Sequence, residues 1–89
     1  MPRTRIAIRI SREEYDSFVK IIGTDEKLPA AYDDWIKRTT KENEQLRARG
    51  EIVNEVDVQA EEFAAYCRLT GQEPSYVLLE AFAVKESRR

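Results

Sequence analysis

The sequence of 89 residues predicts a small α+β domain that is mostly helical and is built from two strand-helix-helix units. Two short segments alternate apolar and polar residues, and each is followed by a segment whose apolar residues recur at helical spacing. Each of these helices ends at a glycine that precedes a further helix. We expect one domain over residues 1–89, with units at 1–38 and 51–89 joined by a polar helical linker at 39–50.

The first unit begins with a strand at residues 5–10, where three isoleucines alternate with two arginines and an alanine. Ser11 and Glu14 form a capping-box pattern, in which each side chain accepts a hydrogen bond from a backbone N–H. A helix should therefore begin directly after the serine and end at Gly23. A second helix is expected to start at Pro29, because proline is well tolerated in the first helical turn.

The second unit repeats this order. A strand is expected at residues 52–58, then a helix that ends at Gly71, then a last helix opened by Ser75. The last helix is apolar nearly all round, so we expect it at the centre of the core. The side chains expected to be buried, because they occupy the apolar phase of their elements, are Ile10, Phe63, Leu78 and Phe82.

The two units also align residue by residue. Ile8–Gly23 superimposes on Val56–Gly71 with a constant offset and no gap, and a length difference in the following loop brings Tyr32 opposite Tyr76. The shared order of strand, helix, glycine and helix favours an internal repeat.

The strand charges are complementary. Residues 1–12 contain four arginines and no acid, whereas residues 51–62 contain five acids and no base. Opposite charges that face each other across two strands stabilise the pair, and like charges destabilise it. Arg5 and Arg9 should therefore meet the acidic strand rather than a copy of themselves. We expect an antiparallel pair within one chain or in a reciprocally swapped dimer.

The stretch VDVQAEEFAAYCRLTGQEPSYVLLEAFAV, at Val56–Val84, resembles the ribbon-helix-helix (Arc/MetJ-like) family. The resemblance implies an antiparallel two-stranded ribbon, here formed by a tandem repeat within one chain. It also implies a DNA-binding transcriptional regulator or antitoxin, with the outward side chains of the ribbon in the major groove. The candidate nucleic-acid contacts are Arg3, Arg5 and Arg9. Because Glu55 and Asp57 stand at the matching outward positions, we expect no sequence-specific DNA binding.

Composition removes several other classes of function. The chain contains no histidine, which is the commonest general base and metal ligand, and it contains one cysteine. Cys67 falls on an apolar helical stripe and is expected in the core. Acidic residues at helix starts are explained by the helix dipole. We therefore predict no catalytic residues, no cofactor and no metal site, and hence a protein that is not an enzyme.

The function that remains is a small protein-interaction or structural module. Tyr32 and Trp35 are the candidate partner contacts, because large aromatic residues on an otherwise polar helix are common interface anchors. We expect a protein partner, with a second copy of the chain as one candidate, and regard nucleic acid as the alternative. No apolar run is long enough to span a bilayer, so a cytoplasmic protein with no membrane partner is expected.

Overall fold

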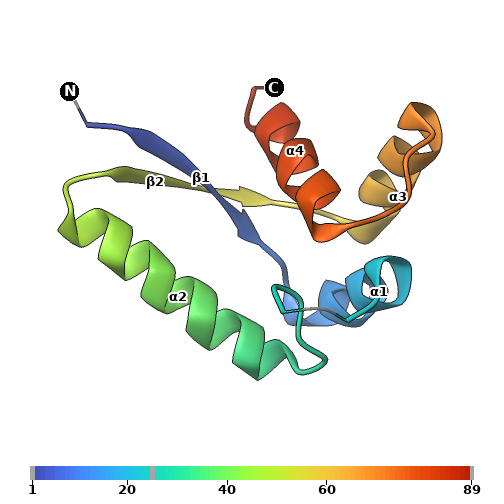
Figure 1. The fold of residues 1–89 in the computed structure, drawn as a ribbon, viewed down its shortest axis with the longest axis horizontal. Helices are drawn as coiled ribbons and strands as arrows, with labels where there is room; N and C mark the ends of the chain where they lie inside the picture. Colours follow the sequence, from blue (N-terminus) through green and yellow to red (C-terminus); the bar gives the residue numbers. More distant parts are fainter. Residues whose placement is uncertain (1, 25, 89) are drawn as a thin grey trace.

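The computed structural model describes residues 2–24 and 26–88, and its elements run strand, helix, helix and then repeat that order (Figure 1). The first three elements are β1 (Thr4–Arg9), α1 (Arg12–Ile22) and α2 (Tyr32–Ala48). The next three are β2 (Ile52–Asp57), α3 (Ala60–Thr70) and α4 (Tyr76–Ser87). The fold is thus α+β and mostly helical, as the sequence predicts.

The two strands pair within the chain, but they run parallel. Thr4 lies beside Ile52 and Arg9 lies beside Asp57. The ladder continues at both ends, where the N–H of Ile52 donates to the carbonyl of Arg3 (2.8 Å) and the N–H of Val58 to that of Arg9 (3.2 Å). The predicted antiparallel ribbon is therefore wrong, and with it the ribbon-helix-helix-like fold class.

The length of α2 explains the parallel arrangement. A parallel pair needs a crossover connection that returns the chain to the start of the first strand. Seventeen residues in α2 span about 25 Å, which is more than the roughly 20 Å of a six-residue strand. Residues 39–48, expected as part of a polar helical linker at 39–50, are helical and continue α2. Because α2 brings the chain back beside Thr4, β2 must run in the same direction as β1.

Two helix starts carry the predicted serine caps, and two other expectations about helix starts are wrong. The Ser11 hydroxyl accepts from the N–H of Glu14 (3.3 Å), and the Ser75 hydroxyl accepts from the N–H of Leu78 (3.1 Å). The carboxylate of Glu14 does not complete the capping box. It accepts instead from the N–H of Ala60 (3.0 Å), so a residue of α1 caps the start of α3. The second helix begins at Tyr32, later than the expected Pro29.

The core lies between the strands and the four helices. α4 packs on both strands, α2 packs on β2, and α1 packs on α3. The four side chains expected in the core, Ile10, Phe63, Leu78 and Phe82, are all at most 6% exposed.

The expectation that α4 lies at the centre of the core holds for only one of its faces. Leu78, Leu79, Phe82 and Ala83 of this helix are buried. Val77, in contrast, is 72% exposed and Val84 is 36% exposed. α4 thus leaves apolar side chains at the surface.

Candidate functional site

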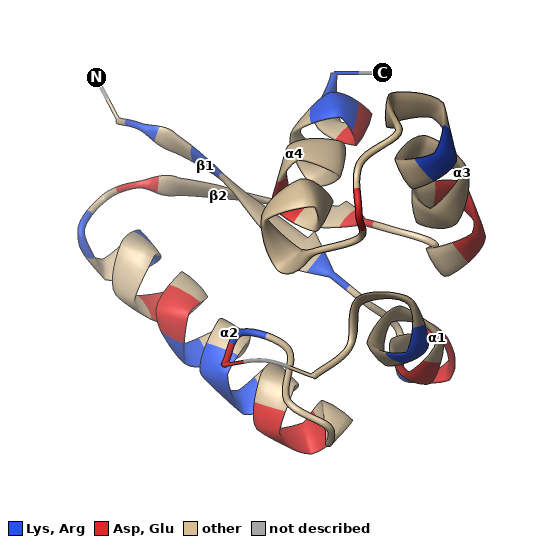
Figure 2. Ribbon diagram, turned by 45° about the vertical axis from the view of Figure 1, so that its right-hand side comes forward, with Lys and Arg blue, Asp and Glu red and all other residues tan. Residues whose placement is uncertain are grey.

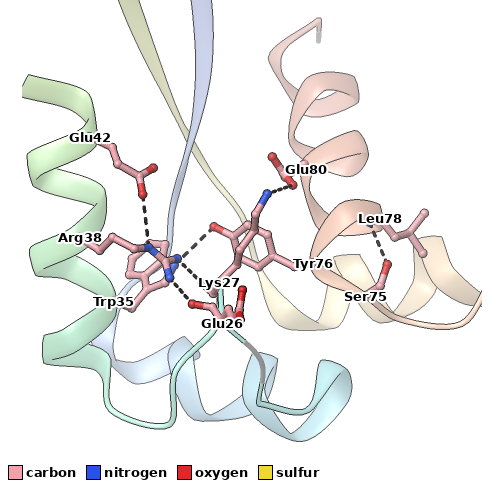
Figure 3. Close-up of polar contacts among 9 residues, drawn as sticks. All are labelled: Glu26, Lys27, Trp35, Arg38, Glu42, Ser75, Tyr76, Leu78 and Glu80. Carbon is pink, nitrogen blue, oxygen red and sulfur yellow. Dashed lines mark hydrogen bonds and ion pairs between the residues drawn. The ribbon is translucent and has the colours of Figure 1, made fainter. Parts of the chain in front are cut away.

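A groove lies between α2 and α4, with β1 along its floor and the segment Glu26–Lys27 at one end (Figure 3). Its volume is about 590 Å³. The floor is formed by residues 4–8 of β1. The walls are formed by Arg38, Thr39, Glu42, Asn43 and Leu46 from α2, and by Tyr76, Glu80, Ala83 and Val84 from α4.

The floor presents one unpaired edge of the sheet. The N–H groups of Ile52 and Val58 donate to the backbone carbonyls of Arg3 and Arg9. The odd-numbered residues of β1 therefore direct their backbone N–H and C=O groups toward β2. Successive residues of a strand direct these groups to opposite edges. Thr4, Ile6 and Ile8 therefore turn their N–H and C=O groups to the edge that borders the groove.

A polar network fixes the closed end of the groove, as Figure 3 shows. The guanidinium of Arg38 donates to the backbone carbonyls of Glu26 and Lys27. It also forms an ion pair with Glu42 one helical turn away (3.4 Å). Across the groove, Lys27 pairs with Glu80 of α4 (3.7 Å). These contacts hold the loop before α2 against both walls.

Tyr76 links the two walls below this network. Its hydroxyl oxygen accepts a hydrogen bond from the indole N–H of Trp35 (3.5 Å). Burial raises the pKa of Tyr76, while the bond from Trp35 and the charge of Arg38 act in the opposite direction. The phenol is therefore neutral at physiological pH, and it serves as a fixed hydrogen-bonding group between α2 and α4.

Charges in the groove are balanced. Its lining contains three acids and three bases, namely Glu26, Glu42, Glu80, Arg5, Lys27 and Arg38. Acidic and basic residues also alternate along α2 (Figure 2). A neutral groove offers little long-range attraction to a polyanion, and it matches a ligand with no large net charge.

Trp35, a candidate partner contact, has no solvent-exposed surface. It is 0% exposed and packs with Tyr15 and Tyr32, at centroid distances of 5.7 and 5.9 Å. Tyr32 is half-buried, and its hydroxyl donates to the carbonyl of Ile10 (3.0 Å). These aromatic residues connect α1 to α2 inside the core, so a partner cannot reach Trp35 in this conformation. Trp35 is thus a packing residue in this structure, whereas Tyr32 keeps part of its side chain at the surface.

The arginines of β1 are engaged with acids that neighbour them. Arg9 makes a two-pronged ion pair with Asp57 (2.7 and 2.8 Å), and this contact lowers the pKa of the Asp57 carboxyl. Arg5 pairs with Glu51 (2.9 Å). Arg3 is exposed, and its backbone carbonyl serves the ladder. The candidate nucleic-acid contacts thus lie along β1, and the structure neutralises two of the three.

The remaining candidates for chemistry are the thiol of Cys67 and the acidic side chains. Cys67 is buried, and burial raises the pKa of its thiol, which disfavours the reactive thiolate. Within residues 2–24 and 26–88, no three potential metal ligands of the His, Cys, Asp and Glu types lie together. In the same residues, no helix has both the length and the apolar character needed to cross a membrane.

Sequence reasoning missed the groove. Its wall residues Asn43 and Leu46 lie in the segment read as a linker, and its floor was assigned to an antiparallel ribbon. The signal in the sequence is Leu46, an apolar residue in that polar stretch, which is half-buried and lines the groove. Ala48, the other apolar residue there, is exposed. No protein-family model, curated protein or solved structure matches the chain.

Proposed function

We propose that this protein is a non-catalytic interaction module that binds an extended polypeptide segment in the groove between α2 and α4. The observation that carries the proposal is the unpaired edge of β1, which lies along the floor of a groove of about 590 Å³. An extended segment placed there would add a third strand to the sheet.

Strand addition is a general mode of peptide recognition. Backbone hydrogen bonds to an exposed sheet edge supply affinity, and pockets for alternate side chains supply specificity. Here the edge residues Thr4, Ile6 and Ile8 offer the backbone groups. Tyr76, Ala83 and Val84 on the α4 wall would contact side chains on one face of the added strand, and α2 those on the other.

A docked strand would also cover a sheet edge that native proteins usually protect. Parallel sheets are normally covered on both faces, and a two-stranded sheet alone is only marginally stable. Unpaired strand edges in native proteins are usually blocked by charge, proline, a bulge or a covering element. β1 contains no proline, and its two strand arginines are paired with acids. A strand docked in the groove would cover this edge.

DNA binding is less well supported. The parallel pair does not give the two-fold ribbon that would enter a major groove, and Arg5 and Arg9 are paired with Glu51 and Asp57. Release of counterions by free basic residues dominates affinity for DNA. The groove, whose acidic and basic residues balance, supplies no excess of basic residues to release counterions from DNA.

Selection of short random peptides displayed on phage tests the proposal. Thr4→Pro removes an N–H from the groove edge while it leaves the bonds to β2 in place, because proline is tolerated on edge strands. Glu55→Pro removes an N–H from the outer edge of β2 instead, and it serves as the matched control. Selected peptides should bind the wild type and Glu55→Pro, and they should lose binding to Thr4→Pro.

Two results would contradict the proposal. Either no peptide is enriched on the folded wild-type protein, or the enriched peptides bind Thr4→Pro as well as they bind Glu55→Pro. Circular dichroism of both variants establishes that each retains its helices before binding is compared.

A further inference from the structure

We infer that the natural occupant of the groove is β1 of a second copy of this chain. The result is a symmetric dimer with one four-stranded sheet in the order β2-β1-β1-β2. This inference rests on the proposed function, because it identifies the polypeptide that the groove binds.

The free edge permits only one full-length register. Most homodimers have a two-fold axis, which pairs the two copies of an edge strand antiparallel. In an antiparallel pair, residues that exchange both backbone hydrogen bonds must direct their N–H and C=O groups to the shared edge. In β1 these are Thr4, Ile6 and Ile8. An axis at Ile6 uses all three, since Ile6 then pairs with itself and Thr4 pairs with Ile8 of the second copy.

This register limits the like-charge repulsion that opposes self-pairing. With the axis at Ile6, Arg5 stands opposite Ala7 of the second copy. Arg5 would face Arg9 only if the axis lay at Ala7, and in that register Thr4 would stand opposite Ile10, beyond the end of β1, so fewer strand residues would pair. With the axis at Ile6, Arg9 stands opposite Arg3 of the second copy at the end of the ladder, and its charge is offset there by the ion pair with Asp57 of its own chain. Both arginines of β1 are also neutralised within their own chain.

An interface formed by the same surface of both copies must be self-complementary. The groove lining holds three acids and three bases, so it carries no net charge that would repel a second copy. On one face, α4 packs on both strands, so the two copies of α4 would lie side by side over the joined sheets. Val84, which borders the groove and is 36% exposed, would be covered there.

Size gives a reason for association. A domain of 89 residues buries a smaller share of its surface than a larger domain does, and it gains stability when apolar surface is covered in a dimer. The four-stranded sheet would leave only the outer edges of the two β2 strands unpaired. A second copy is always present with the first, so no further partner is required.

Sedimentation velocity over a wide range of protein concentration tests the dimer. Val84→Lys places a charge at the groove wall, and Val77→Lys places the same charge on α4 outside the groove lining. The wild type and Val77→Lys should form dimers of equal strength. Val84→Lys should weaken the dimer about tenfold or more, because an unpaired charge is buried in the interface. Thr4→Pro, which changes an exposed side chain, should weaken it as well.

The outcomes separate this inference from the proposed function. A wild type that stays monomeric at every concentration overturns the dimer, while peptide selection still tests the groove. A dimer that Val77→Lys weakens as much as Val84→Lys, with Thr4→Pro unaffected, also overturns it, since association would then use another surface. If Val84→Lys fails to fold, Thr4→Pro compared with Glu55→Pro gives the same decision.

Discussion

The two strand-helix-helix units share a local pattern but use their second helices differently. α2 has seventeen residues and a mostly polar surface, whereas α4 has twelve, buries an apolar face and also exposes Val77 and Val84. Both begin with a tyrosine, and Trp35 and Leu79, each three residues further on, are both 0% exposed. α2 sets the direction of β2 through its length, and α4 supplies an apolar wall to the groove. A repeat can thus keep its core positions while its exposed faces acquire separate roles.

The largest expected effect concerns the two equivalent core positions. Trp35→Ala should cost about 3–5 kcal/mol, because it removes the indole that packs on Tyr15 and Tyr32 and the hydrogen bond to Tyr76. Leu79→Ala should cost somewhat less, about 2–5 kcal/mol. Urea unfolding followed by circular dichroism measures both. A cost for Trp35→Ala below that for Leu79→Ala would show that the aromatic cluster does not organise the first unit.

The second comparison is between Tyr15 and its counterpart Phe63, both 0% exposed. Burial raises the pKa of Tyr15 to about 12, and its hydroxyl donates to the carbonyl of Pro29. The folded state therefore holds this proton more tightly than the unfolded chain, whose tyrosine pKa is about 10. The resulting stability is complete below pH 10 and is lost as the pH rises toward 12, by roughly 2–3 kcal/mol.

Tyr15→Phe tests this dependence, because the first unit then carries the side chain that the second unit already has. The variant loses about 1 kcal/mol at neutral pH with the hydrogen bond, but its stability should fall less steeply from about pH 10 to about pH 12. Tyr76, whose pKa is also raised by burial, supplies the remaining slope. Equal slopes in the wild type and the variant would contradict the assignment.

A smaller effect is expected at the cap that joins the units. Glu14→Ala removes the acceptor for the N–H of Ala60, and it should cost about 1 kcal/mol, as the loss of other helix caps does. Glu62 occupies the equivalent place in the repeat and is exposed. Glu62→Ala should change stability by about 0.5 kcal/mol or less. Thermal unfolding of both variants checks the difference, and equal costs would show that Glu14 has no special role.

Much of the fold follows from local sequence. Alternation predicts both strands, Ser11 and Ser75 mark two helix starts, and Gly23 and Gly71, both with positive φ, follow the ends of α1 and α3. The strand direction does not follow from such signals, because the opposite charges of the two strands attract each other in either orientation. It depends on whether residues 39–48 continue a helix, and their polar surface hides the contact of α2 with β2.

The site was harder to predict for the same reason. Aromatic side chains such as Trp35 are common both in cores and at interfaces, so the residue type alone could not distinguish the two. The groove is made instead from backbone groups of β1 and from walls far apart in the sequence. A strand edge carries no residue signature, since its ligands are the N–H and C=O groups that every strand possesses.

Amide hydrogen exchange of β1, measured by NMR over a dilution series, tests the central claim most directly. The N–H groups of Arg5, Ala7 and Arg9 should be protected at every concentration, because they bond to β2. Those of Ile6 and Ile8 should exchange fast in dilute protein and become protected as the concentration rises and a second copy fills the groove. Protection of Ile6 and Ile8 that does not depend on concentration, or fast exchange at Ala7, would contradict an open β1 edge beside a parallel β2.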